Sequence, residues 1–286
     1  MSKETRTVGA AGGGEGFEIV ASVQTDKGCV HEANEDSGRF VRPSDPALLR
    51  RKGALMIVAD GMGGHSAGEV ASQMAVELVS RLYYEAAGDD APGALAAAVA
   101  EANRRIHAAA AADEAKRGMG TTCTALALRE GGAFAAHVGD SRLYLLRGGG
   151  VYQLSEDHSH VMELVRHGLL TKEEARHHED KNVILRALGT TPEVEVSAVA
   201  PMRVEAGDHF LLCSDGLHDL VADEEIGRVV AAAGDEHAAC EQLIALAKER
   251  GGHDNITVGL AGVVPQGTAA AGAESTPTTR EVEAVR

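Results

Sequence analysis

The chain has 286 residues, of which 44% are hydrophobic but only 3% aromatic, so aliphatic side chains must fill the core. A chain of this length can bury such a core without disulfides. Its 27 Lys and Arg against 43 Asp and Glu give a net charge of −16, which disfavours nucleic acid and anionic membranes as partners. The acidity is typical of a solvated surface, and it is also compatible with carboxylates clustered to hold cations.

The two ends of the chain differ in composition from the part between them. We expect residues 1–16, which are Gly-rich and polar, to be flexible, residues 17–265 to fold as one domain, and residues 266–286 to form a disordered tail. The N-terminus has no apolar run of the kind found in signal peptides. No apolar stretch approaches about 18 residues, so no transmembrane helix is expected.

Short apolar or alternating runs bounded by turn residues predict strands. They lie at 17–24, 54–59, 122–129, 133–138, 142–147, 208–213 and 256–264. Glu130-Gly131-Gly132 is a suitable hairpin connection between the third and fourth runs, and Gly148–Gly150 predicts another turn.

Longer segments with apolar residues at helical spacing, or rich in Ala, predict helices at 66–86, 92–116 and 236–250. Strands come first, then two helices, then more strands, and finally a helix and a closing strand. This order lacks the regular alternation of a doubly wound parallel sheet. It predicts an α+β fold, with a mainly antiparallel β-sandwich flanked by helices.

The four cysteines, Cys29, Cys123, Cys213 and Cys240, form no C-x-x-C pair and no Cys/His cluster with zinc spacing. We interpret them as reduced and structural, which suits the cytoplasm. We expect a monomer.

Four aspartates stand at the ends of expected strands, beside Gly or another polar turn residue. Apolar strands run into Asp60 (IVADGMGGH), Asp140 (AHVGDSR) and Asp215 (LLCSDGLHD), while Asp254 (GGHDNITV) precedes one. A strand fixes the backbone and aims each carboxylate from one end of the sheet. Carboxylate and carbonyl oxygens are hard ligands that suit Mg²⁺, Mn²⁺ or Ca²⁺.

Any one of these Asp residues could equally be a turn former. The acidic segment Asn34-Glu35-Asp36, taken alone, could likewise be a polar turn. Four strand-edge aspartates in one chain nevertheless indicate a metal-binding protein, without indicating its substrate.

Seven segments, in order, resemble the motifs of type 2C protein phosphatases, the metal-dependent (PPM) family, in their bacterial form. They are TDKGCVHEANED, VADGMGGHSAGEVAS, GMGTTCTAL, VGDSRLYLL, LSEDHSHVMELVRHG, LLCSDGLHDLV and HDNITVGL. Together they cover roughly residues 18–262, nearly the whole expected domain. The resemblance implies a PPM-type phosphatase domain at 17–265 with α-β-β-α layers and metals at one end, between the sheets.

The resemblance also implies a role for each acidic residue. Asp60 should bridge two Mn²⁺ or Mg²⁺ ions, and the carbonyl of Gly61 should bind one of them. Asp215 and Asp254 should complete the coordination of the other ion. Asp140, together with Asp215, resembles the site of a third, weaker ion. Glu35 and Asp36 match an acidic pair that acts on the metal shell largely through water.

The implied reaction is hydrolysis of phosphoserine and phosphothreonine in proteins by a metal-activated water. No covalent phosphoenzyme is implied, so no Cys or Ser nucleophile is expected. A cognate Ser/Thr kinase and its phosphoprotein targets are the partners that such an enzyme implies.

Two positions depart from the family pattern. The Arg that usually grips the substrate phosphate is replaced by His31, which cannot form a bidentate contact. Either His31 binds the phosphate more weakly, or another residue such as Arg39 does so. Met62 stands where some relatives have a general-acid His, and His65 follows three residues later. His65 either protonates the leaving oxygen or only structures the Gly-rich turn.

Residues 155–190 match the variable flap beside the active site and contain several His residues. Because their spacing gives no consistent ligand set, we favour a mobile polar lid over a metal cluster. Two further hypotheses remain. One is a pseudophosphatase acting as a signalling or binding module, which only His31 supports. The other is a metal-dependent hydrolase of a phosphodiester or a small phosphate ester.

Overall fold

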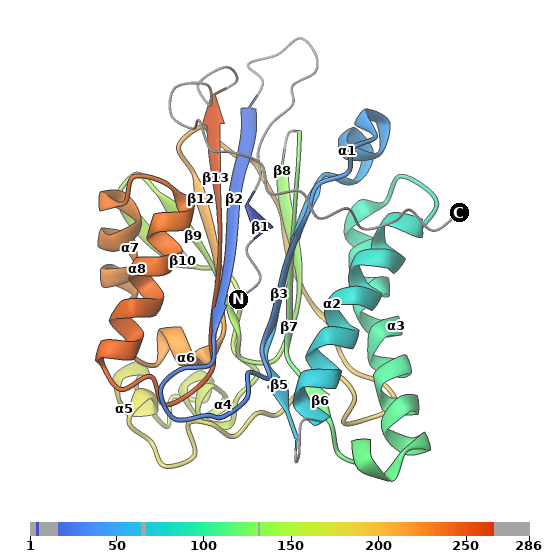
Figure 1. Ribbon diagram of the computed structural model, residues 1–286, viewed down its shortest axis with the longest axis vertical. Helices are drawn as coiled ribbons and strands as arrows, with labels where there is room; N and C mark the ends of the chain where they lie inside the picture. The colour runs from blue at the N-terminus through green and yellow to red at the C-terminus, as the bar shows by residue number, and fades with distance from the viewer. Residues whose placement is uncertain (1–3, 6–16, 64–66, 131, 266–286) are drawn as a thin grey trace.

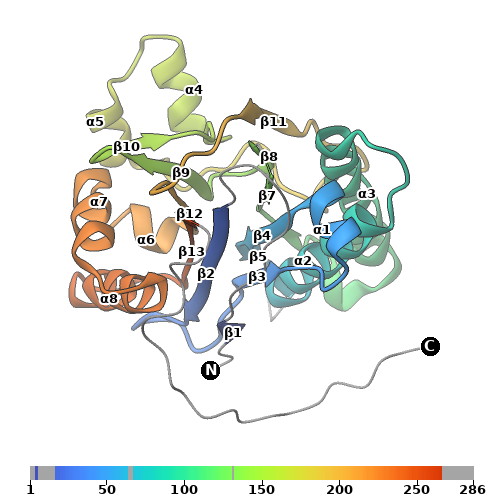
Figure 2. The ribbon, with the colours of Figure 1, turned by 90° about the horizontal axis from the view of Figure 1, so that it is seen from above.

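The computed structural model describes residues 4–5, 17–63, 67–130 and 132–265. Two β-sheets pack face to face, and helices cover the outer face of each sheet (Figures 1 and 2). The predicted α+β sandwich with α-β-β-α layers is confirmed. Within the segment expected to be flexible, Glu4–Thr5 forms a two-residue strand. The rest of residues 1–16, and the expected tail at 266–286, lie outside the described residues.

The first sheet joins six of the described strands in the order β1-β2-β13-β12-β9-β10, all antiparallel. Their bounds are β1 (Glu4–Thr5), β2 (Phe17–Asp26), β9 (Arg142–Arg147), β10 (Gly150–Gln153), β12 (His209–Cys213) and β13 (Ile256–Pro265). β2 and β13 pair along their whole lengths, with Asp26 opposite Ile256. This register brings the loop after β2 beside the residues that precede β13.

The second sheet joins five described strands in the order β11-β8-β7-β4-β3, again antiparallel. Their bounds are β3 (Ser37–Val41), β4 (Ala54–Ala59), β7 (Cys123–Arg129), β8 (Gly132–Val138) and β11 (Ser197–Met202). A two-stranded piece, β5 (Gly61–Met62) with β6 (Gly120–Thr121), continues from β4.

Helices of very different length complete the fold. They are α1 (Pro46–Lys52), α2 (Ala67–Glu85), α3 (Ala91–Ala112), the 3₁₀ turn η1 (Glu114–Lys116), α4 (His160–Arg166), α5 (Lys172–Arg176), α6 (Asp215–His218), α7 (Asp223–Ala232) and α8 (Glu236–Glu249). α2 and α3 cover the second sheet, and α7 and α8 cover the first (Figure 2). Asp90 caps α3 by accepting from the backbone N–H of Gly93 at 3.0 Å.

Three apolar clusters correspond to the three interfaces between the layers. β4 shows how one strand serves two of them. Leu55 and Ile57 face the helices α2 and α3, whereas Met56 and Val58 face the other sheet. Because both faces of β4 are covered, its sequence is a continuous apolar run rather than an alternating one.

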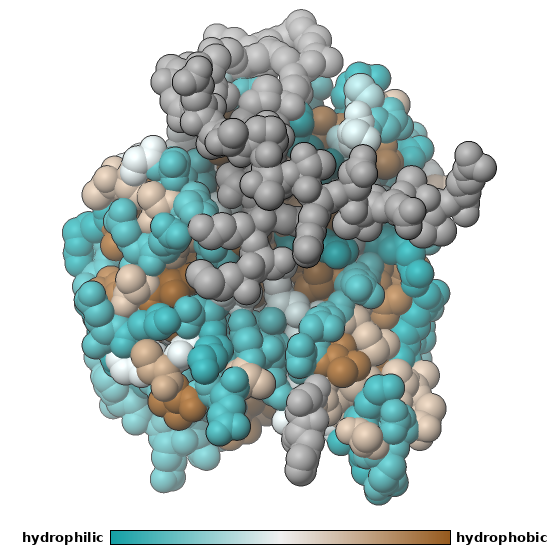
Figure 3. All heavy atoms as spheres, viewed as in Figure 1, coloured by the Kyte–Doolittle hydropathy of each residue, from teal (hydrophilic) through white to brown (hydrophobic). Residues whose placement is uncertain are grey.

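The predicted turn between β9 and β10 is confirmed. Gly148 and Gly149 have φ of 59° and 81°, the left-handed values that a type I′ hairpin needs at both central positions. On the face shown in Figure 3, the hydrophilic side chains form a broad cover with separate hydrophobic patches between them. No helix within the described residues is long and apolar enough to cross a membrane.

Candidate active site

Five aspartates lie where strands begin or end at one end of the sandwich, near β5 and α6 in Figure 1. They are Asp36, directly before β3; Asp60, directly after β4; Asp140, two residues after β8; Asp215, the first residue of α6; and Asp254, two residues before β13. Because neighbouring strands are antiparallel, the starts of some and the ends of others meet at this edge.

The electrostatics show that these carboxylates face one another. Burial, followed by repulsion from Asp36, Asp215, Asp140 and Asp254, raises the pKa of Asp60 well above its ordinary value. Burial and then repulsion from Asp140 and Asp254 do the same to Asp215. Burial is also the main cause that raises the pKa of Asp36 to about 6 and that of Asp140 to about 7.

A buried carboxylate is costly unless a cation or hydrogen bonds compensate its charge. Here Oδ1 of Asp36, Asp140 and Asp215 is buried and accepts no hydrogen bond. This donor set of unpaired hard oxygens fits Mg²⁺ or Mn²⁺. Among the described residues, no three His, Cys, Asp or Glu side chains are already arranged to hold an ion. Ion binding therefore requires bridging waters or rotation of the carboxylates.

The backbone of Asp60 is fixed by two threonines of the GTT segment. Its N–H donates to Oγ1 of Thr122 at 2.8 Å, and its carbonyl accepts from the N–H of Thr122 at 2.8 Å and from Oγ1 of Thr121 at 2.9 Å. Gly61 follows, and a Cβ there would collide with the backbone carbonyls of Gly68 and Glu35. Only glycine therefore allows α2 and the acidic loop to approach this point so closely.

Asn255 holds the loop after β2 against the segment that leads from Asp254 into β13. Its amide nitrogen donates to the carbonyls of Lys27 and Ala33, both at 3.0 Å, and its oxygen accepts from the N–H of Glu35 at 2.7 Å. These three contacts fix the acidic loop relative to Asp254. Sequence reasoning missed this role, although Asn255 lies inside the HDN motif.

Ser214 plays a similar part for Asp36. Its hydroxyl donates to Oδ2 of Asp36 at 2.7 Å and accepts from the N–H of Thr257 at 2.9 Å. It thus joins β3, β12 and β13 through one side chain. Its place directly before Asp215 was the only signal in the sequence.

Glu35 and His31 lie at the exposed side of the cluster. Burial, and then repulsion from Glu69 and Asp254, raises the pKa of Glu35, although His31 opposes this rise. The carboxylate of Glu35 packs against Gly68 near the start of α2. Nε2 of His31 lies 3.5 Å from Oδ1 of Asp254, with half of its side chain exposed. The expected phosphate-binding residue therefore borders the carboxylate cluster.

The other sequence-based candidates are not brought to the site in the same way. Arg39 lies on β3 opposite Ile57, on the same face as Ser37, whose hydroxyl contacts Ser72 of α2 at 3.0 Å. Because side chains two apart on a strand share a face, Arg39 points towards α2 and away from the space between the sheets. His65 lies outside the described residues.

Near the start of the flap, residues 155–190, the half-buried ring of His158 packs against the buried ring of His137 on β8. The rings of His137 and His158 lie 4.8 Å apart, and Nδ1 of His158 accepts from the N–H of Gly139 at 3.0 Å. Burial lowers the pKa of both rings to about 4, so both are neutral and serve packing. Arg142, in a doubly hydrogen-bonded pair with Asp157, anchors the same segment.

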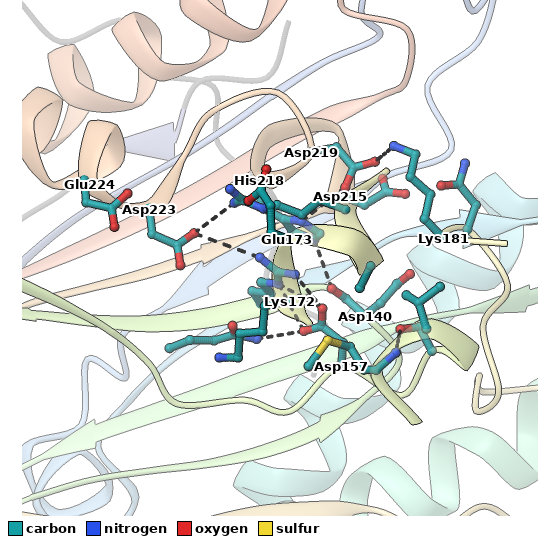
Figure 4. A pocket seen from close by; sticks show the side chains of 18 residues that line it. Asp140, Asp157, Lys172, Glu173, Lys181, Asp215, His218, Asp219, Asp223 and Glu224 are labelled. Atoms are coloured by element: carbon teal, nitrogen blue, oxygen red, sulfur yellow. Dashed lines mark hydrogen bonds and ion pairs between the residues drawn. The ribbon is translucent and has the colours of Figure 1, made fainter. Parts of the chain in front are cut away.

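Between the flap and α6 lies a cavity of about 200 Å³ (Figure 4). Asp140, Asp215 and His218 line one side of it, and Lys172 and Lys181 of the flap line another. The cavity therefore connects the carboxylate cluster to the flap, which makes it a site where a substrate or an ion can reach the aspartates.

An α-β-β-α sandwich with uncompensated carboxylates between its sheets has the architecture and ligand set of a metal-dependent hydrolase. A family model described as "Protein phosphatase 2C" matches residues 34–250. The chain belongs to this family. It is an enzyme, a serine/threonine protein phosphatase.

Curated relatives carry the same activity in their names. The serine/threonine phosphatase Stp of Listeria innocua is 40% identical over 243 residues, covering 83% of this chain and 93% of the relative. The serine/threonine protein phosphatase PstP of Mycobacterium tuberculosis is also 40% identical, but its match covers 85% of this chain and only 45% of PstP.

Solved structures agree with these sequence matches. The M. tuberculosis PstP/Ppp phosphatase superposes with a TM-score of 0.77 at 38% identity, covering 86% of this chain and 99% of that one. A PstP catalytic domain in complex with two manganese ions gives a TM-score of 0.75 at 38% identity, covering 87% and 99%. None of these comparisons favours an inactive signalling module.

Proposed function

We propose that the chain hydrolyses phosphoserine and phosphothreonine esters by direct attack of water, at a centre of two divalent ions held between the sheets. The observation that carries this proposal is the convergence of five aspartates, three of which have a buried and unpaired oxygen. When bound, divalent ions acidify a coordinated water and offset negative charge on the phosphoryl oxygens.

The residues of this chain position that chemistry. We assign Asp60 as the ligand shared by both ions and the Gly61 carbonyl as a ligand of one. We assign Asp215 and Asp254 as the residues that complete the ligand set of the second ion. The threonine contacts to the backbone of Asp60 support a rigid bridging position, because they fix it before any ion binds.

We assign less direct roles to the residues around these two ions. Glu35 and Asp36 act on the ions through water, and the hydrogen bond from Ser214 orients Asp36 for that task. Asp140, with Asp215, takes a third and weaker ion. His31 binds the substrate phosphate from beside Asp254, and His65 protonates the leaving oxygen.

For the physiological setting, we propose Mn²⁺ as the preferred ion with Mg²⁺ less effective, which the manganese-bound relative supports. We propose phosphoproteins of a cognate Ser/Thr kinase as substrates. A monomeric, cytoplasmic domain at residues 17–265 is also proposed. The four cysteines are free, and three are buried, which supports a reducing compartment.

The experiment compares chelated protein with protein supplied with Mn²⁺ or Mg²⁺, on a phosphothreonine peptide, p-nitrophenyl phosphate and a phosphodiester. We expect no turnover after chelation, recovery with Mn²⁺ that exceeds recovery with Mg²⁺, and cleavage of the two monoesters only. Full activity in excess EDTA would contradict the metal centre, and preference for the diester would contradict the substrate class.

A further inference from the structure

Four arginines lie on or beside the second sheet of a chain that is strongly acidic, with 43 Asp and Glu against 27 Lys and Arg. Arg50 and Arg51 are exposed in the last turn of α1, and Arg129 is the last residue of β7. Arg39 is exposed on β3, the edge strand next to β4. We call these four residues the arginine row. The residue roles proposed above use none of them.

Contacts hold Arg129 beside the end of α1. Its Nη1 lies 3.5 Å from the carbonyl oxygen of Arg51, and its guanidinium carbon lies 5.7 Å from the centre of the Phe134 ring. A Cβ at Gly53, directly after α1, would lie 2.8 Å from the Cβ of Arg129. These contacts bring a third guanidinium next to Arg50 and Arg51 and restrict its motion, so that less entropy is lost when it binds an anion.

The charges of the arginine row are not compensated. Within the part of the chain that the structure describes, none of its four side chains pairs with a carboxylate. By contrast, the exposed arginines of α3, Arg104 and Arg105, both pair with Glu101. Cations in the last turn of α1 also stabilise the helix dipole, but that role does not reach Arg39 on β3. The row therefore presents free positive charge that the fold alone does not explain.

The row extends from the catalytic end of the sandwich to the other end. Asp36 stands directly before β3 and Arg39 lies three residues later, about 10 Å further along an extended strand. On the neighbouring β4, seven residues or about 23 Å separate Asp60 from Gly53 at the end of α1. Figure 1 shows α1 at the opposite end of the sandwich from β5 and α6. An extended peptide that leaves the metal centre along β3 therefore passes Arg39 after about three residues and reaches α1 after about seven.

We propose that the arginine row is a docking surface for an acidic segment of the phosphoprotein substrate, which binds there while the phosphorylated residue occupies the metal centre. The inference deepens the proposed function and rests on it. Guanidinium groups bind carboxylates through two parallel hydrogen bonds, and unpaired exposed charges steer a partner of opposite charge. Because the chain carries a net charge of −16, an acidic segment is repelled by most of its surface and is held at this row.

Steady-state kinetics with three phosphothreonine peptides in Mn²⁺ test the proposal. One peptide has Glu at the third and seventh positions before the phosphothreonine, one has Glu at the same positions after it, and one has Gln at all four. For the wild type, we expect KM of the Glu peptide whose chain direction matches the row to be about five- to tenfold lower than KM of the Gln peptide. This preference should shrink in about 0.5 M NaCl, because salt screens exposed charges.

Matched variants locate the preference on the surface. In Arg50→Gln/Arg51→Gln the preference should fall to about twofold or less. Arg104→Gln/Arg105→Gln removes the same two charges from α3 and should keep it. Arg39→Gln leaves α1 intact and should lower the preference at least about twofold, so the test stands even if the α1 variant fails to fold. Hydrolysis of p-nitrophenyl phosphate, which has no acidic segment, should be unchanged in all three variants.

The outcomes separate this inference from the proposed function. Equal KM values for the three peptides, or a preference that survives in Arg50→Gln/Arg51→Gln and in Arg39→Gln, would overturn the docking surface and leave the metal centre standing. An equal loss in Arg104→Gln/Arg105→Gln would overturn it too, because net charge alone would then explain the preference. Binding to phosphatidylglycerol vesicles that only Arg50→Gln/Arg51→Gln loses, with peptide KM unchanged, would assign the row to a membrane instead. No turnover of any phosphopeptide by the Mn²⁺-saturated wild type would overturn the proposed function itself.

Discussion

Asp36 offers a test of the metal centre that needs no substrate. It is 6% exposed, its Oδ2 accepts from Ser214 at 2.7 Å, and its Oδ1 has no partner. Asp36→Asn keeps the size of the side chain and removes its charge. We expect the variant to be more stable than the wild type in EDTA at pH 8, although a buried carboxylate is lost.

The magnitude follows from the folded-state pKa of Asp36, which is about 6 against 3.8 for the ordinary group. At about 1.4 kcal/mol per pKa unit, ionising this carboxyl destabilises the metal-free fold by about 3 kcal/mol. The stability that protonated Asp36 contributes to the metal-free wild type is therefore fully present below about pH 4 and is lost as pH rises through about 6. An unpartnered amide N–H costs about 1–2 kcal/mol, which leaves a net gain of about 1–2 kcal/mol at pH 8.

Urea unfolding at pH 4 and pH 8, in EDTA and in saturating Mn²⁺, measures this effect. In EDTA the extra stability of Asp36→Asn over the wild type should vanish at pH 4. In Mn²⁺ at pH 8 the wild type should be the more stable protein, because it binds the ions more tightly.

Asp157→Asn is the matched control, since Asp157 is equally buried but pairs with Arg142 at 2.7 Å. The free energy of unfolding of Asp157→Asn should be about 3–5 kcal/mol lower than that of the wild type at pH 8, both in EDTA and in Mn²⁺. If Asp36→Asn at pH 8 in EDTA is destabilised as much as Asp157→Asn, the reasoning on uncompensated charge is wrong.

Other predictions follow from the same site. His31→Arg should lower KM for a phosphopeptide about 5- to 30-fold, equivalent to about 1–2 kcal/mol of binding free energy, because Arg offers a forked, permanent charge beside Asp254. Unchanged KM in His31→Arg and His31→Ala would place the phosphate elsewhere. Asn255→Ala removes three hydrogen bonds and should cost about 2–4 kcal/mol in urea unfolding and weaken Mn²⁺ binding in calorimetry; unchanged Mn²⁺ affinity would show that it positions nothing. Asp140→Asn should keep two tightly bound Mn²⁺ ions, and loss of either in calorimetry would contradict its assignment to the weaker position. Replacing all four cysteines by Ser should preserve Mn²⁺-dependent turnover, and abolished activity in a folded variant would point to a thiol nucleophile.

The elements that the sequence predicted are those with strong local signals. β4 matches its apolar run of 54–59, and α2 and α8 match their expected ranges within a residue or two. The segment expected as one helix at 92–116 instead ends at Ala112 and continues as η1, because Asp113 adopts an extended conformation and caps the 3₁₀ turn.

Short elements escaped sequence reasoning because tertiary contacts define them. β3 and β11 lie at the edges of their sheet and have partly exposed side chains. β3 (SGRFV) lacks an apolar run, and Pro201 within β11 (SAVAPM) argues against a strand in the sequence. α6 is a single four-residue turn that begins with the site residue Asp215, and it is too short to show a helical pattern in the sequence. α1 did carry a signal: Asp45 caps it and Pro46 opens it.

The residues of the site also divide into those that the sequence revealed and those that it did not. Aspartates at strand ends were visible because apolar strands mark them, and the structure brings them together. The contacts of Asn255 and Ser214 were not visible, since each joins segments far apart in sequence. The orientation of Arg39 depended on the face of β3, which only the pairing with β4 fixes.

The central claim is that carboxylate-held ions at Asp60 perform the hydrolysis. The most direct measurement is phosphate release from a phosphothreonine peptide by wild type and Asp60→Asn in saturating Mn²⁺, with folding checked by circular dichroism and bound Mn²⁺ counted by calorimetry. We expect a folded Asp60→Asn with impaired Mn²⁺ binding and a kcat at least about a hundredfold lower. A folded Asp60→Asn that turns over at the wild-type rate would contradict the account.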